Sequence, residues 1–270
     1  MGMNRMDYYG KTFVLFELVK NLYKRELSFL DTSLQETKRY PVRCIKAWTV
    51  DYLKKNFERF RLWEKNYNLY YSVACLKEMP SFSFNLKKRK QEQENFKAAF
   101  SLYIEHYDFV FDLDNPDLKE AHRDAKKLKE FFDLFEVPYS VRYSGNKGFH
   151  FAISGDFFPR YSFSQVKLFE AIALRLKKGI PSIDSSIYDE RRILKLPYSL
   201  VAVNGHENVV LPLNEKQFEN FDVKDMEVNN VMRDVHLMNR GNLVRKGSEK
   251  NVSEFLKYFG GNENEFAEIR

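Results

Sequence analysis

Asp112 and Asp114 stand two residues apart at the end of the apolar run 109–111. Alternate side chains of a β-strand point to opposite faces, so this spacing places both carboxylates side by side on one face. Two like charges in that position repel each other unless a cation lies between them. Carboxylate oxygens suit Mg²⁺ or Mn²⁺, and carboxylate pairs hold the ions of two-metal nucleotidyl transfer. A solvated strand end that leads into a helix cap would explain the same two residues.

The segment 144–150, Ser-Gly-Asn-Lys-Gly-Phe-His, is predicted to form a hairpin and is a second candidate for chemistry. Its two glycines allow a sharp turn close to a ligand, and backbone N–H groups in such a turn favour an anion. Lys147 adds a positive charge, and the returning strand puts His150 on the face opposite Phe149. Ser144 and His150 would then flank a triphosphate. An ordinary surface hairpin with an incidental histidine is the alternative.

A third group of charged residues follows within 184–195. Asp184 would supply a third carboxylate, and Asp189 competes with it for that role. Arg192 and Lys195 could offer positive charge to phosphates. A surface ion pair would explain each of these residues taken singly.

The composition is that of an ordered globular chain with a basic balance. Its 270 residues are 44% hydrophobic and 30% charged, which is enough for one large or two small domains. The net charge of +6 favours polyanionic partners such as nucleic acids or nucleotides. Cys44 and Cys75 are the only cysteines, which excludes a disulfide framework and a four-cysteine zinc site. We see no signal peptide and no membrane-spanning run, so we expect a cytoplasmic protein without a membrane partner.

Helices and strands are predicted to mix along the whole chain. Those of the first half are a helix at 12–24, a strand at 25–29, a helix at 50–60 and a strand at 67–76. Phe13, Phe16 and Val19 form the expected apolar stripe of the first helix, with Leu15, Leu18 and Leu22 beside it. Thr49 is the expected N-cap of the second helix. The polar segment 80–95 carries the basic run 87–90, which is either a solvated surface or a contact to a phosphate backbone.

The second half begins with a helix for which Asn115 is the expected N-cap and Pro116 the first residue. The elements expected after it are strands at 139–144 and 149–154, a helix that stops at 177–179, and strands at 192–200 and 209–213. The chain contains neither a GxGxxG sequence nor a P-loop lysine, so neither Rossmann nor Walker chemistry is supported.

In this order the segments resemble the archaeo-eukaryotic primase superfamily, in particular the small catalytic subunit of replicative primases and related primase-polymerases. The family has an acidic pair after an apolar strand, a Ser-Gly-x-x-Gly-x-His hairpin, and an acidic residue shortly before an Arg/Lys-x-Pro-x-Ser strand. The matching segments here are the pair at 112–114, the hairpin at 144–150, Asp184, and Lys-Leu-Pro-Tyr-Ser at 195–199. Tyr8-Tyr9 and the segment 25–29 resemble the paired tyrosines and the Arg-Glu-aromatic-x-Phe segment of the family. The resemblance covers roughly residues 8–213.

The resemblance implies a fold and a division of the chain. The implied fold is α/β (α+β), with a mixed, mainly antiparallel sheet as the catalytic platform and an N-terminal α/β lobe. The lobe would cover about 1–105, the metal- and nucleotide-binding module about 106–222, and an extension of unknown role 223–270.

The resemblance also implies roles residue by residue. Asp112, Asp114 and Asp184 would be catalytic and would hold two Mg²⁺ or Mn²⁺ ions. The residues implied for binding the incoming nucleotide are Ser144, Asn146, Lys147, His150, Arg192, Lys195 and Arg25. Asn146 occupies a loop position that is often basic in the family.

Two departures from the family are visible. Cys44 and Cys75 cannot build the zinc-binding cluster of replicative small subunits, so no zinc is expected. Val201 stands where a histidine often follows the Pro-x-Ser sequence. Both departures indicate a divergent primase-polymerase associated with a plasmid, a phage or defence, or a catalytic core cut from a longer protein.

The activity implied is primer synthesis and extension on single-stranded DNA from NTPs or dNTPs, by two-metal nucleotidyl transfer. Further partners would be other domains of a longer chain or a replication or defence complex. A gap-filling repair polymerase of the same superfamily and a non-catalytic nucleic-acid-binding module are the alternatives. A metal-dependent nuclease is a weaker one, because it has no need of a triphosphate hairpin.

Overall fold

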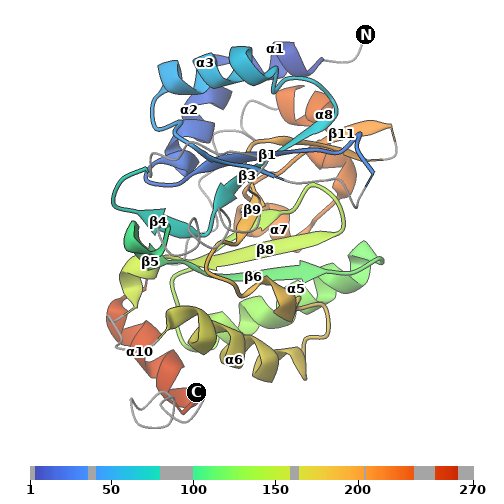
Figure 1. The fold of residues 1–270 in the computed structure, drawn as a ribbon. Helices are drawn as coiled ribbons and strands as arrows, with labels where there is room; N and C mark the ends of the chain where they lie inside the picture. Colours follow the sequence, from blue (N-terminus) through green and yellow to red (C-terminus); the bar gives the residue numbers. More distant parts are fainter. Residues whose placement is uncertain are drawn as a thin grey trace. The chain divides into compact units, whose positions relative to one another are not determined.

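The structure is a computed structural model that describes residues 4–35, 41–79, 100–158, 164–203, 205–233 and 247–260 (Figure 1). The segment 80–95, with its basic run, lies outside these residues. The chain is a mixed α/β protein with antiparallel sheets, so the predicted fold class is confirmed. None of the described helices is long and apolar enough to cross a membrane.

The chain forms two compact units. The first contains residues 1–106, 190–210 and 227–229, and the second contains residues 107–189, 211–226 and 230–270. Residues 190–210 join the first unit, although the sequence analysis placed them in the second module, because strand β9 (Ile193–Lys195) pairs with β3 (Tyr67–Ser72). Helix α10 (Glu249–Tyr258), within the predicted extension of unknown role, belongs to the second unit.

The first unit is built on a four-stranded antiparallel sheet in the order β2-β1-β3-β9, together with a β4-β5 pair and a β10-β11 hairpin. Its other strands are β1 (Leu27–Asp31), β2 (Val42–Ile45), β4 (Ala74–Leu76), β5 (Ile104–Tyr107), β10 (Leu200–Val203) and β11 (His206–Val209). Its helices are α1 (Arg5–Tyr9), α2 (Thr12–Leu22) and α3 (Val50–Phe60). The three helices lie over one face of the sheet (Figure 1).

The second unit is built on a three-stranded antiparallel sheet in the order β6-β8-β7. Its strands are β6 (Phe109–Asp114), β7 (Ser140–Tyr143) and β8 (Gly148–Ile153). Its helices besides α10 are α5 (Leu118–Leu134), α6 (Gln165–Lys177) and α7 (Glu215–Glu219), with short 3₁₀ turns at η3 (Gly155–Phe157), η4 (Ser185–Ile187) and η5 (Val223–Met226). Helix α8 (Val228–Arg233) crosses the division between the units.

Aromatic side chains hold the helices of the second unit against its sheet. Phe109 of β6 stacks on Phe169 of α6, with ring centroids 4.3 Å apart, and Phe111 meets Phe132 of α5 edge-on at 5.4 Å. Phe255 of α10 contacts Phe132 at 5.8 Å. Such pairs contribute roughly 0.5–1.5 kcal/mol each beyond the area they bury. The apolar face of the sheet is therefore the face that the helices cover.

Two local features differ from the prediction. Helix α2 buries Val14, Leu15 and Leu18, whereas Phe16 of the predicted stripe is 60% exposed. The helix carries apolar residues around most of its surface, and packing against α3 decides which of them turn inward. The N-cap of α5 is Asp117 instead of Asn115. The Asn115 side chain instead accepts a hydrogen bond from the Asp117 N–H, so a turn precedes the cap.

Three predicted strands are also shorter or displaced. The segment 67–76 breaks after Ser72, whose hydroxyl donates to the Ala74 carbonyl. The segment 192–200 is interrupted at 196–199, between β9 and β10, and within this interruption Tyr198 has a positive φ of 64°, which a strand does not allow. The predicted strand 209–213 is displaced, because β11 already ends at Val209. After it, Leu211 and Leu213 form backbone hydrogen bonds with β7. Thr49, by contrast, caps α3 as predicted.

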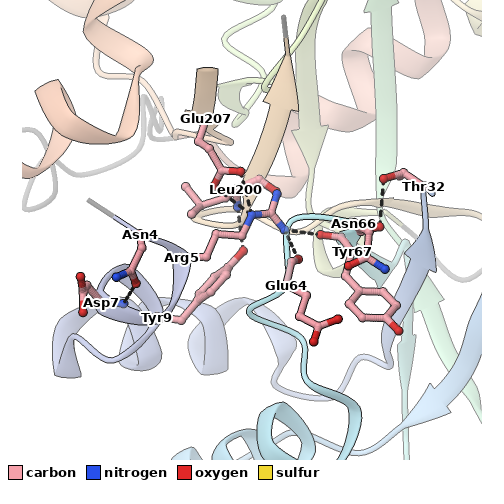
Figure 2. A network of polar contacts seen from close by, with 10 residues as sticks. All are labelled: Asn4, Arg5, Asp7, Tyr9, Thr32, Glu64, Asn66, Tyr67, Leu200 and Glu207. Atoms are coloured by element: carbon pink, nitrogen blue, oxygen red, sulfur yellow. Dashed lines mark hydrogen bonds and ion pairs between the residues drawn. The ribbon is translucent and has the colours of Figure 1, made fainter. Parts of the chain in front are cut away.

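Helix α1 is anchored in the first unit by a buried arginine (Figure 2). Arg5 donates to both carboxylate oxygens of Glu207 at 2.9–3.0 Å and to the carbonyls of Tyr67 and Leu200. The Leu200 N–H donates to the hydroxyl of Tyr9, and burial raises the pKa of Tyr9 to about 12. These bonds satisfy a charge that would otherwise be costly to bury.

Removal of Glu207 should therefore destabilise the first unit. In Glu207→Ala the guanidinium stays buried without its carboxylate, which costs about 3–5 kcal/mol. Lys20→Ala is the control, because Lys20 is exposed and lies 3.8 Å from Glu17. Urea unfolding followed by tryptophan fluorescence would measure both variants, since Trp48 and Trp63 belong to the first unit. Equal midpoints for the two variants would contradict the anchoring role.

Candidate active site

A row of polar side chains crosses the second unit's sheet on the face opposite its aromatic core. In the register of the sheet Asp112 pairs with His150, and His150 pairs with Arg142. On the other side of β6, Leu113 bridges Ile183 and the Asp184 N–H donates to the Asp112 carbonyl at 2.8 Å. Directly opposed residues of antiparallel strands share a face. The polar row thus consists of Arg142, His150, Asp112 and Asp184.

Neighbouring side chains of the row contact one another. The Arg142 Nε–H donates to His150 Nδ1 at 3.1 Å, and His150 Nε2 lies 3.4 Å from Asp112 Oδ1. Arg142 is 7% and His150 3% exposed, whereas Asp112 is half-buried. Sequence reasoning missed Arg142, although its place two residues before the Ser-Gly turn puts it on the histidine's face.

The glycine hairpin ends beside the second aspartate. Asp114 pairs in register with Gly148 and its carboxylate lies 3.5 Å from Lys147 Nζ. Both side chains are exposed to solvent. The Ser144 N–H donates to the Gly148 carbonyl at 2.9 Å, and the Tyr143 hydroxyl donates to the Asn146 carbonyl at 2.8 Å. The predicted hairpin therefore exists, with Lys147 at its solvent-exposed tip.

Both glycines of the hairpin are required by its backbone. Gly145 has a φ of 85°, which side chains other than that of glycine rarely tolerate. Gly148 lies so close to β6 that an added Cβ would stand 1.7 Å from the Leu113 carbonyl oxygen. The sequence motif thus has a structural reason, independent of any ligand.

An aromatic cluster supports the hairpin from the core. His122 of α5 packs on Phe149 at 5.3 Å and on Phe218 at 5.2 Å, and its Nε2 lies 2.6 Å from the Phe218 carbonyl. Burial lowers the pKa of His122 below its usual 6.5. These contacts give His122 a structural role, in support of the hairpin.

The segment that carries Asp184 is held by a buried carboxylate that sequence reasoning also missed. Asp124 of α5 accepts from the Ser182 N–H at 3.0 Å and from Lys127 at 2.9 Å. Burial alone would raise the pKa of Asp124, but these hydrogen bonds outweigh it and leave the pKa below the usual 3.8. Asp124 lies on the apolar face of α5, between Ala121 and Ala125, and an acid in such a position requires a partner.

The three predicted metal ligands are not gathered around one point. No group of three or more His, Cys, Asp or Glu side chains within the described residues is placed to hold a metal ion. Asp184 accepts from the Ser186 N–H and caps η4, while Asp114 faces Lys147. The donor types nevertheless suit Mg²⁺ or Mn²⁺, because all three are carboxylates on one face of the sheet.

The other predicted nucleotide ligands, Arg25, Arg192 and Lys195, belong to the first unit. Arg25 donates to the carbonyls of Ser72 and Val73 and lies over the Tyr71 ring. Lys195 pairs with Tyr70, so its side chain lies on the opposite face of the sheet from that of Tyr71.

The structure also shows the surroundings of two further predicted residues, Arg192 and Asp189. The Arg192 carbonyl accepts from the Val73 N–H, and its buried Nε makes no hydrogen bond to the described residues. Asp189, the competitor for the third acidic role, is exposed, whereas Asp184 pairs with the backbone of Asp112.

Comparison with solved structures identifies the fold as that of a polymerase domain. The polymerase domain of Ligase D from Mycobacterium tuberculosis, in complex with DNA, superposes with a TM-score of 0.53 at 14% identity, covering 85% of this chain and 89% of that domain. Primase RepB′ superposes with a TM-score of 0.37 at 11% identity, covering 68% of this chain and 49% of the other.

Sequence comparison finds a relative of unknown function. No model of a protein family matches the chain. The uncharacterized protein MJECS07 from Methanocaldococcus jannaschii is 23% identical over 246 residues, which cover 82% of this chain and 54% of that protein. The chain thus spans about half the length of this curated relative.

The close approach at Gly148 predicts that this glycine is irreplaceable. In Gly148→Ala the new methyl group must displace β6 or the hairpin, which typically costs about 1–3 kcal/mol. Gly179→Ala is the control, because an added Cβ there meets no described atom closer than the Leu176 carbonyl oxygen at 3.9 Å. Scanning calorimetry should show a lower Tm for Gly148→Ala only. An unchanged Tm would refute the contact.

The carboxylate of Asp124 should contribute to the free energy of unfolding in a way that depends on pH. Because its folded pKa lies below 3.8, its contribution is complete above about pH 4 and is lost as the pH falls through the folded pKa. Asp124→Asn removes this contribution. The wild type should lose Tm more steeply than the variant as the pH falls below about 4. Parallel Tm curves would argue against the hydrogen-bonded carboxylate.

Proposed function

We propose that this chain is the catalytic core of a primase-polymerase of the archaeo-eukaryotic primase superfamily. The reaction would be metal-dependent transfer of nucleotides to a primer on single-stranded DNA, from NTPs or dNTPs. The observation that carries the proposal is that Asp112, Asp114 and Asp184 lie on one face of a sheet, beside a glycine hairpin that presents Lys147.

The polymerase-domain fold supports this proposal but does not replace the site as its basis. Clustered carboxylates are unfavourable near the phosphates of nucleic acid unless cations separate the two. A protein that only binds DNA would gain nothing from them. The basic net charge of +6 suits a polyanionic template.

Asp112, Asp114 and Asp184 would hold two Mg²⁺ or Mn²⁺ ions. When bound, the ions would lower the pKa of the primer hydroxyl and neutralise charge on the transferring phosphate. Lys147 is exposed at the hairpin tip, where its ammonium group can leave Asp114 for a phosphate of the nucleotide. Asn146 directly precedes Lys147, and Ser144 stands at the start of the turn. Nucleotide binding by Ser144, Asn146, Arg25, Arg192 and Lys195 stays a prediction.

A polymerase that extends primers but does not start them is the second candidate. It is favoured by the likeness to a polymerase domain in complex with DNA. The two candidates share the site and differ in whether two free nucleotides can be joined. Other domains of a longer protein, or a replication or defence complex, would complete either function.

The first test is synthesis on unprimed and on primed single-stranded DNA with Mg²⁺ or Mn²⁺, supplied with NTPs or dNTPs. We expect the wild type to make product and Asp112→Asn to lose activity by orders of magnitude, because one metal ligand is neutralised. Asp189→Asn, an exposed acid on the following turn, is the matched control and should retain activity. If Asp189→Asn lost activity while Asp184→Asn retained it, Asp189 would be the third carboxylate ligand in place of Asp184.

The templates separate the candidates. Product on the unprimed template indicates a primase-polymerase, and product on the primed template alone indicates the extending polymerase. Wild-type activity in Asp112→Asn would overturn the proposed chemistry. A folded wild type that is silent on both templates and does not bind Mn²⁺ would favour a non-catalytic nucleic-acid-binding module.

A further inference from the structure

We propose that Arg142 is a positioning residue that orients His150, and that His150 in turn orients the carboxylate of Asp112. By its motif alone, His150 is expected to bind the triphosphate, and Arg142 belongs to no motif. The geometric part of the proposal stands on the contacts of the polar row alone. Its functional part rests on the proposed function, because it takes Asp112 as a metal ligand.

The hydrogen bond between Arg142 and His150 can have only one direction. Arginine is always protonated in proteins and has only N–H donors, so His150 Nδ1 must accept from Arg142 Nε at 3.1 Å. A proton on Nδ1 would place two donors against each other. The single ring proton of neutral His150 therefore resides on Nε2.

The second contact follows from this tautomer. Nε2 is the ring nitrogen that lies 3.4 Å from Asp112 Oδ1, so its proton faces the carboxylate. The opposite tautomer would turn a lone pair toward a negative charge. Arg142 thus determines whether the histidine attracts or repels Asp112, although strand β8 separates its own strand β7 from the aspartate's strand β6.

Burial makes the arrangement rigid. Arg142 and His150 are 7% and 3% exposed, and both strand pairs hold their backbones in register. A hydrogen bond in such surroundings is less weakened by competing water than one at the surface. His150 Nδ1 accepts from Arg142 and Nε2 faces Asp112, so each ring nitrogen lies beside a side chain of the row.

The expected effect is on metal affinity. Carboxylate ligands are usually held by a second layer of hydrogen bonds, and loss of such a partner typically weakens metal binding about 10–100-fold. Loss of Arg142 should therefore act on Mn²⁺ binding, although Arg142 itself is not a ligand.

Two substitutions separate the donor from the bulk of the side chain. Arg142→Gln places an amide nitrogen at the same number of bonds from Cα as the arginine Nε, so it can still donate to Nδ1. Arg142→Met keeps the length of the side chain but donates nothing. Arg123→Met, an exposed arginine on α5, is the control.

The first readout is ¹⁵N NMR of histidine-labelled protein, with the His150 signals identified by their loss in His150→Gln. We expect the Nε2–H tautomer in the wild type, in Arg142→Gln and in Arg123→Met, and its loss in Arg142→Met. A wild-type His150 that carries its proton on Nδ1 would overturn the proposal, even if Arg142→Met fails to fold.

The second readout is Mn²⁺ affinity by calorimetry, with thermal unfolding as a check of the fold. We expect Arg142→Met to bind about 10–100-fold more weakly and Arg142→Gln to stay near the wild type. Equal affinity in folded Arg142→Met and wild type would overturn the functional part. A wild type with the expected tautomer but no Mn²⁺ binding would overturn the proposed function, whereas a wrong tautomer would overturn only the role of Arg142.

Discussion

The candidate site depends on the register in which β6 pairs with its neighbours. Phe109 and Phe111 point to the helices, and this directs Asp112 and Asp114 to the opposite face. Because side chains alternate with a period of two, a slip by one residue would exchange the aromatic core for the carboxylates. Burial of the aromatic rings therefore specifies where the acids lie. The pairing with β8 then brings His150 to Asp112, and the bridge to Ile183 brings Asp184 beside it.

The cost of such a site is the burial of polar groups, and the structure offsets it with hydrogen bonds. Asp124 holds the Ser182 N–H, and Arg142 and His150 engage each other within the row. In the first unit Arg5 is satisfied in the same way by a carboxylate and by backbone carbonyls (Figure 2). Each of these groups would destabilise the fold if its partner were missing. Polar residues in the two units thus specify which segments pair as well as contributing stability.

The evidence for the fold of this chain differs in kind from the evidence for its proposed function. The likeness to a polymerase domain at 14% identity concerns the course of the backbone, which many sequences can adopt. The proposed chemistry rests on particular side chains, and each of the three carboxylates is engaged in the structure by a partner of its own, such as Lys147 beside Asp114. Displacing these partners is the change that cation binding would require. Asp112 differs from the other two acids because its partner is a buried histidine.

The sequence by itself determined the local features, because these depend on near neighbours in the chain. The alternation of β6, the glycine turn before Phe149 and the Thr49 cap could all be predicted. Tertiary structure decided what depends on packing between distant segments: the inward face of α2, the break at Tyr198, and the return of 190–210 to the first unit. It also brought Arg142 and Asp124 to the site. Neither belongs to a motif, and their roles arise only because pairing and helix packing place a buried charge beside a partner far away in the sequence.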